Sequence, residues 1–72
     1  MKQFIYRVSN EEFADTTAFG KAWTDAQAKA KSLHEPIYRT VVNGEKVEEQ
    51  VFFSFGYFNN VKFATAENIK IF

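Results

Sequence analysis

The chain has 72 residues, of which 46% are hydrophobic and 25% charged, a composition typical of an ordinary globular domain. It contains no Cys and a single His, which excludes disulfides and an ordinary zinc site. Nine Lys and Arg residues balance nine Asp and Glu residues, so the chain has no overall electrostatic bias toward nucleic acid.

The first predicted element is a strand over residues 3–8, where side chains alternate at period two. Residues 9–12 are predicted to form a turn or loop. Residues 13–23 fit two structures. A strand over 16–22 would pair back on the first strand, whereas a helix would use Ser9-x-x-Glu12 as a capping box. Two adjacent Thr residues and an interior Gly weaken the helix, so the strand is favoured.

The clearest element is a helix over residues 24–34. Thr24-x-x-Gln27 is a capping box that predicts its start, and Pro36 ends it at or before Glu35. Trp23 directly precedes the expected N-cap, in the position of a hydrophobic staple. The face that should pack against the sheet is narrow and made of small residues. It comprises Ala22, Ala26, Ala30 and Leu33.

Residues 37–55 are predicted to form a β-hairpin, because Asn43-Gly44 lies between two β-rich runs. A two-residue loop would pair Val42 with Glu45, and a four-residue loop would shift the pairing by two without changing the faces. One face of the hairpin is the better candidate for the core. It carries Tyr38, Thr40, Val42, Val47, Val51, Phe53 and Phe55.

The remainder of the chain is predicted to be a long connection over residues 56–66 and a final strand over 68–72 that is tied into the sheet. These elements together predict a single α+β domain over residues 1–72. Its order is ββαβββ, an antiparallel sheet with one helix packed on one face.

The chain is rich in aromatic residues, with nine Phe, three Tyr and one Trp. Six of them fall within residues 52–63, and one short Ala-faced helix can cover only a few. Part of this segment is therefore a candidate interaction surface. Its candidate residues are Tyr57, Phe58, Phe63, Asn59 and Asn60.

The same segment places aromatics around Gly56, as the RNA-recognition motif does, but Ser54 stands where that motif has a basic residue. The motif's second Gly is missing as well, and the second helix of that fold is not predicted. No stretch of the chain resembles a known family closely enough to assign one.

No catalytic signature stands out, and we expect neither enzymatic activity nor a cofactor or metal. His34 is expected to favour the helix dipole, and the cluster of Glu45, Glu48 and Glu49 to be solvated and paired with nearby cations. The favoured hypothesis is a small interaction protein that binds a protein partner or forms a homodimer through its aromatic surface. The alternative is a nucleic-acid-binding regulatory protein that uses the sheet face.

The N-terminal residues contain no apolar run of signal-peptide length, and no segment could span a bilayer. We therefore expect a cytoplasmic protein without membrane association. Compact, Cys-free chains of this size are common among bacterial and phage accessory proteins, which is the expected kind of source.

Overall fold

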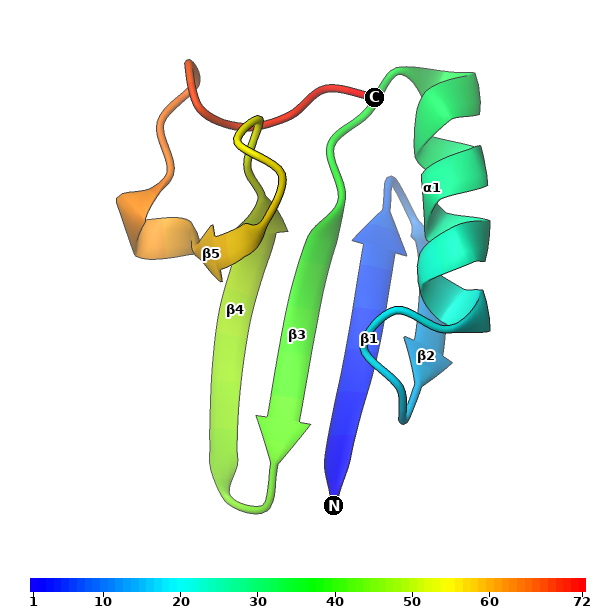
Figure 1. Ribbon diagram of the computed structural model, residues 1–72, viewed down its shortest axis with the longest axis vertical. Helices are drawn as coiled ribbons and strands as arrows, with labels where there is room; N and C mark the ends of the chain where they lie inside the picture. Colours follow the sequence, from blue (N-terminus) through cyan, green and yellow to red (C-terminus); the bar gives the residue numbers. More distant parts are fainter.

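The computed structural model describes residues 1–72 and has one α-helix and a five-stranded sheet (Figure 1). All strand pairs are antiparallel, and the strand order is β2-β1-β3-β4-β5. The prediction of a small α+β fold with one helix on one face of an antiparallel sheet is confirmed. In chain order the elements are β1 (Lys2–Val8), β2 (Glu11–Asp15), α1 (Lys21–Leu33), β3 (Tyr38–Asn43), β4 (Lys46–Phe52), β5 (Phe58–Asn60) and the 3₁₀ helix η1 (Val61–Phe63).

The first hairpin turns earlier than the sequence suggested. Val8 pairs with Glu11, so Ser9 and Asn10 alone form the turn, and Ser9 adopts a positive φ of 55°. The strand expected over residues 16–22 is wrong, because β2 occupies residues 11–15 and the chain then loops to the helix. Phe13 lies opposite Tyr6 on β1 and packs against the core, which fixes β2 over these earlier residues.

The helix begins at Lys21, three residues before the predicted start. Its N-cap is Gly20, which has no side chain to accept a capping bond, and the Thr24 hydroxyl donates to the Gly20 carbonyl. The predicted capping box is therefore wrong. The acceptor comes from the end of β2: Oδ2 of Asp15 accepts the backbone N–H of Ala22 at 3.2 Å. The start of this helix is set by a side chain that lies outside it.

The face of α1 that meets the sheet consists of alanines. Ala22, Ala26 and Ala30 are buried as predicted, whereas Leu33 is 44% exposed. Small side chains allow the helix to lie close to the sheet, where Phe4, Tyr6 and Val8 of β1 supply the bulk of the core. The helix ends at Leu33, and His34 adopts the left-handed conformation with its N–H bonded to the Ala30 carbonyl. Trp23 lies inside the helix, so it is not a hydrophobic staple.

The predicted hairpin between residues 37 and 55 is present, with Gly44 and Glu45 at its tip. Val42 pairs with Val47, which is the register of the longer-loop alternative and excludes the pairing of Val42 with Glu45. Gly44 has a positive φ of 64°, and Asn43 belongs to β3. The turn therefore depends on Gly44 rather than on the Asn-Gly pair.

The sheet face chosen for the core was the wrong one. Arg39 lies opposite Tyr6, and Val41 lies opposite Phe4, so these β3 residues share the helix-facing side. Tyr38, Thr40 and Val42 lie on the other face, which α1 leaves open. Val51 and Phe53 are nevertheless buried, although outside the main core cluster, while Val47 and Phe55 are exposed.

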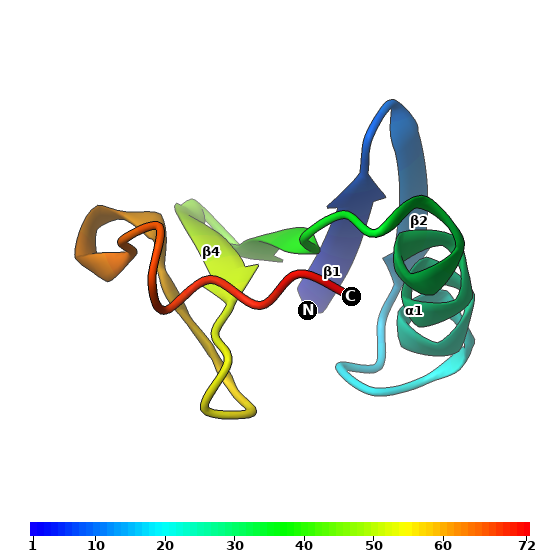
Figure 2. The same ribbon diagram turned by 90° about the horizontal axis from the view of Figure 1, so that it is seen from above.

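The C-terminal third also differs from the expectation. β5 interrupts the predicted connection over 56–66, and residues 68–72 form no strand. A single bridge joins Ile69 to Phe53, and the Phe72 N–H donates to the Glu35 carbonyl. Figure 2 shows this tail crossing the helix-facing side of the sheet to end near α1. The tail is thus fixed by a few backbone bonds and by packing instead of by a sheet register.

The 13 residues of α1 fall short of a membrane crossing, and no helix of the structure combines the length and apolar character that one needs.

Candidate interaction surface

Most of the aromatic side chains meet in one cluster between α1 and the far half of the sheet. Trp23 is its centre, with ring centroids 5.6 Å from Tyr6, 5.2 Å from Phe52 and 5.4 Å from Phe58. Phe72 closes the cluster from the C-terminal tail, 6.4 Å from Trp23 and 5.6 Å from Phe52. Tilted and edge-to-face geometries at these distances are favourable for aromatic pairs. A large share of the aromatic side chains is therefore packed inside the protein.

Three of the five predicted interaction residues belong to β5, at the border of this cluster. Phe58 is partly buried there, with the Arg39 guanidinium 3.9 Å from its ring centroid. Asn59 and Asn60 are half-buried and pair with Val51 and Gln50 of β4. These three residues therefore contribute to the sheet and core, and they present little free surface.

Two exposed aromatics lie in the loop between β4 and β5. Phe55 is 70% exposed and Tyr57 50% exposed, and their rings stack at 6.2 Å with an interplanar angle of 22°. Both rings also approach Phe53, which is buried, at 6.5 Å and 5.9 Å. Figure 2 shows the loop, drawn in yellow, projecting away from the sheet on the side where α1 lies. We call residues 53–57 the aromatic loop.

The aromatic loop has defined backbone geometry. The Phe53 N–H donates to the Tyr57 carbonyl at 2.9 Å, and the Gly56 N–H donates to the Phe53 carbonyl at 3.0 Å. Gly56 has a φ of 101°, which L side chains rarely adopt. The loop is thereby closed into a tight turn that holds Phe55 and Tyr57 side by side.

Phe63 lies apart from this loop, on η1. It is 57% exposed, and Lys62 lies 5.2 Å from its ring centroid. Phe63 makes no ring contact with Phe55 or Tyr57. The five candidate residues are thus divided among the aromatic loop, β5 and η1.

Alternation with Phe53 predicts that Phe55 lies in the core, yet Phe55 is the most exposed of the Phe and Tyr residues. Ser54 and Gly56 on either side were the signals that the strand had already ended.

The open face of the sheet carries a polar network in place of a binding platform. Arg7 donates to the Thr40 hydroxyl at 2.6 Å and to Glu49 at 3.1 Å, and the Thr40 hydroxyl donates to Glu49 at 2.8 Å. These residues connect β1, β3 and β4 across the face. Because the Arg7 charge is paired with a carboxylate, it is not free for a phosphate.

The remaining titratable candidates do not converge on one site. Glu49 points to the open face, Glu48 lies on the helix-facing side with Gln50, and Glu45 is in the turn. His34 is exposed at the end of α1. No three His, Asp or Glu side chains lie close enough together to hold a metal ion.

No protein-family model matches this chain, and comparisons with curated proteins and with solved structures find no similar protein.

Proposed function

We propose that this protein is a non-catalytic interaction protein that associates with a second copy of itself through the aromatic loop. The observation that carries the proposal is the exposed, stacked pair of Phe55 and Tyr57 on a loop with fixed geometry. Aromatic side chains are enriched at the centres of protein interfaces, where a partner buries them.

The two rings would supply part of the apolar surface that an interface buries. An aromatic side chain buries roughly 150–250 Å². Covering the exposed parts of Phe55 and Tyr57 would therefore remove on the order of 200 Å² of apolar surface per copy. At about 25 cal/mol per Å², this corresponds to about 5 kcal/mol per copy before the entropic cost of association.

The charge distribution favours a second copy as the occupant. Residues 52–60 contain no charged side chain, and the whole chain has a formal net charge of zero. A two-fold interface joins the same surface patch of both copies, so a patch with charges of one sign would repel itself there. An uncharged aromatic loop avoids this repulsion and can pack against an identical loop.

A sedimentation velocity series over protein concentration tests the proposal. We expect the wild-type protein to show concentration-dependent dimer formation that persists at high salt, because the interface is apolar. The double variant Phe55→Ser, Tyr57→Ser should remain monomeric with an unchanged circular dichroism spectrum. Phe19→Ser is the matched control, since Phe19 is 64% exposed but precedes α1, outside the loop.

Three outcomes would contradict the proposal. A wild-type protein that stays monomeric at every concentration would remove the second copy as occupant. A dimer that is lost equally in the Phe19→Ser control would place the interface elsewhere. Sedimentation with an added single-stranded oligonucleotide at physiological salt should leave the boundary unchanged, and a complex there would favour nucleic-acid binding instead.

A further inference from the structure

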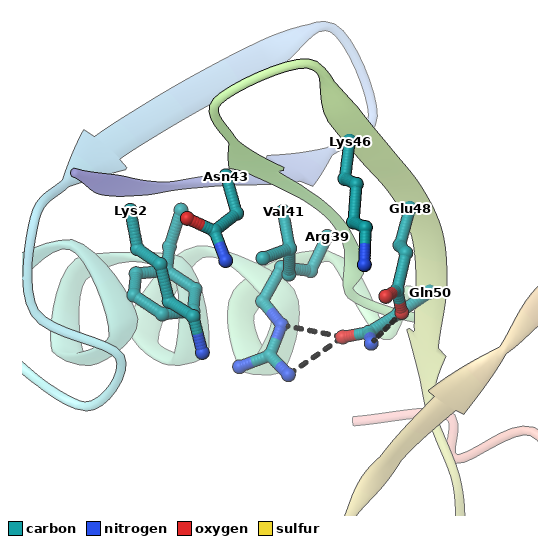
Figure 3. A pocket seen from close by; sticks show the side chains of 8 residues that line it. Lys2, Arg39, Val41, Asn43, Lys46, Glu48 and Gln50 are labelled. Carbon is teal, nitrogen blue, oxygen red and sulfur yellow. Dashed lines mark hydrogen bonds between the residues drawn. The ribbon is translucent and has the colours of Figure 1, made fainter.

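A second feature lies on the helix-facing side of the sheet, in the part that α1 does not cover. The helix packs against β1 and β2, which leaves the adjoining surface of β3 and β4 open. A cavity of about 270 Å³ lies there (Figure 3). Its lining comes from β1, β3 and β4 and comprises Lys2, Phe4, Arg39, Val41, Asn43, Lys46, Glu48 and Gln50.

Arg39 is the fixed cation of this cavity. Its guanidinium lies over the rings of Phe58, Phe4 and Tyr6, at 3.9, 5.3 and 5.9 Å from their centroids. Nε and Nη2 both donate to Oε1 of Gln50, at 2.9 Å and 2.6 Å. This fork holds the guanidinium plane in place, yet the acceptor is a neutral amide.

The charge of Arg39 therefore has no anionic partner within the protein. The ion pairs of the structure are Arg7–Glu49, Lys21–Asp25 and Lys29–Glu11, and none involves Arg39. Arg39 is half-exposed and lines the cavity, so its charge can reach a ligand there.

Two lysines add to this positive charge. Figure 3 shows the Lys2 side chain pointing toward the Arg39 guanidinium and the Lys46 side chain pointing toward Glu48 on β4. Neither lysine forms an ion pair. The only acid of the lining is Glu48, which accepts a 3.3 Å hydrogen bond from Gln50 Nε2. Three cations and one carboxylate give the lining a net charge of +2, although the chain as a whole is neutral.

We infer that this cavity binds a small dianion through charged oxygens, as presented by a phosphate monoester or a short dicarboxylate. Arg39 supplies the planar donor fork that matches both groups, and Lys2 and Lys46 supply mobile charge. The volume is just below the range of about 300–1,000 Å³ of typical ligand pockets, which favours a small ligand. Phe4 and Val41 provide an apolar wall for a short carbon chain.

A titration of the ¹⁵N-labelled protein, followed by NMR at constant ionic strength, tests this inference. Inorganic phosphate and succinate are the probes, and sodium chloride is the blank. We expect saturable shifts of the Arg39 Nε–H and of the Lys2 and Lys46 amides with at least one probe. A response to phosphate alone identifies a phosphoryl ligand, and a response to succinate identifies a carboxylate ligand.

A matched pair of variants tests whether the lining charges are responsible. The double variant Lys2→Met, Lys46→Met should weaken binding about tenfold, as expected for losing a charge-assisted contact. Both side chains are exposed, so the fold should persist. Lys31→Met with Lys62→Met removes the same charge from exposed residues that do not line the cavity and should leave the affinity within about twofold, because salt screens exposed charges.

Equal weakening by both pairs would show non-specific attraction and overturn the inference. So would the lack of a saturable response to either probe at concentrations up to about 10 mM, which would saturate a site with a dissociation constant near 1 mM. The double variant Phe55→Ser, Tyr57→Ser leaves the cavity lining intact, so it should bind the anion as the wild-type protein does. The two proposals therefore stand or fall separately.

Discussion

Asp15 shows how a single side chain organises the turn into the helix. Its Oδ1 accepts the N–H of Thr17, and its Oδ2 accepts the N–H of Ala22, both at 3.2 Å. A Cβ placed on Gly20 would lie 2.7 Å from the same Oδ2, so a residue with a side chain would displace the carboxylate. These backbone donors, that of Ala22 foremost, lower the pKa of Asp15 below its usual value of 3.8.

The lowered pKa of Asp15 predicts a specific loss of stability in acid. Because its pKa is lower in the folded than in the unfolded protein, Asp15 stabilises the fold fully above pH 3.8, and this stabilisation is lost as the pH falls through the folded pKa. Asp15→Asn should lower the urea midpoint at pH 7 and reduce its acid dependence below pH 4. Glu67→Gln, an exposed carboxyl outside this loop, should leave both unchanged. An Asp15→Asn variant that loses stability in acid as steeply as the wild type would refute this role.

Gly44 determines the tip of the second hairpin. Its φ of 64° is unfavourable for L residues with a side chain, and a Cβ there would meet nothing within 4 Å. Gly44→Ala should therefore cost about 1–2 kcal/mol through backbone conformation alone. Asn43→Ala should cost less than about 0.5 kcal/mol, because Asn43 is exposed and has no positive φ. Urea unfolding of the two variants compares them directly, and equal losses would indicate a turn centred on both residues.

At the scale of elements, Trp23 joins the helix to the far half of the sheet. Its ring lies within 6.4 Å of rings from β1, β4, β5 and the tail. Trp23→Ala should cost about 3–5 kcal/mol, as expected for removing a large side chain from a packed cluster. That loss is a large fraction of the stability of a small domain.

The control for Trp23→Ala is Phe19→Ala, which removes an exposed ring whose one aromatic partner is Trp23. It should cost less than about 1 kcal/mol. Thermal unfolding followed by near-ultraviolet circular dichroism measures both variants. Similar melting temperatures for the two would show that the cluster contributes little to joining these elements.

The sequence patterns located most elements, and they failed where contacts between residues far apart in the chain determine an element's boundary or its buried face. The strand over 3–8, the buried alanines of the helix and the hairpin after Pro36 follow from local periodicity. The start of α1 could not be derived in this way, because the side chain that accepts the N–H of Ala22 is Asp15, outside the helix. The choice of hairpin face failed for a related reason: the more apolar face was expected to be buried, whereas the register against β1 places Arg39 over aromatic rings on the helix-facing side.

For the molecule as a whole, the main feature is that the aromatic side chains fall into two groups. One part packs around Trp23, and the other remains exposed, chiefly on the aromatic loop and η1. The exposure of Tyr57 and Phe63 agrees with the composition argument that one short helix cannot cover every ring. Phe55, expected in the core, is exposed because β4 ends before it, and Phe58, expected on the surface, is partly buried because it belongs to β5.

The cavity around Arg39 had no counterpart in the sequence patterns. Lys2, Arg39 and Lys46 come from three strands and are scattered along the chain. Only the pairing of β1 with β3 and of β3 with β4 brings them to one place. A charge-neutral composition therefore does not exclude a locally cationic site.

The central claim is that the aromatic loop is where two copies of this protein meet. Isotope-filtered NOE spectra of a mixture of ¹³C-labelled and unlabelled chains test it most directly, because they report only contacts between copies. We predict intermolecular NOEs between the ring protons of Phe55 and Tyr57 and the same loop of the other copy. Intermolecular NOEs that arise only from Phe19 or Phe63, or none at a concentration where a dimer is present, would contradict the claim.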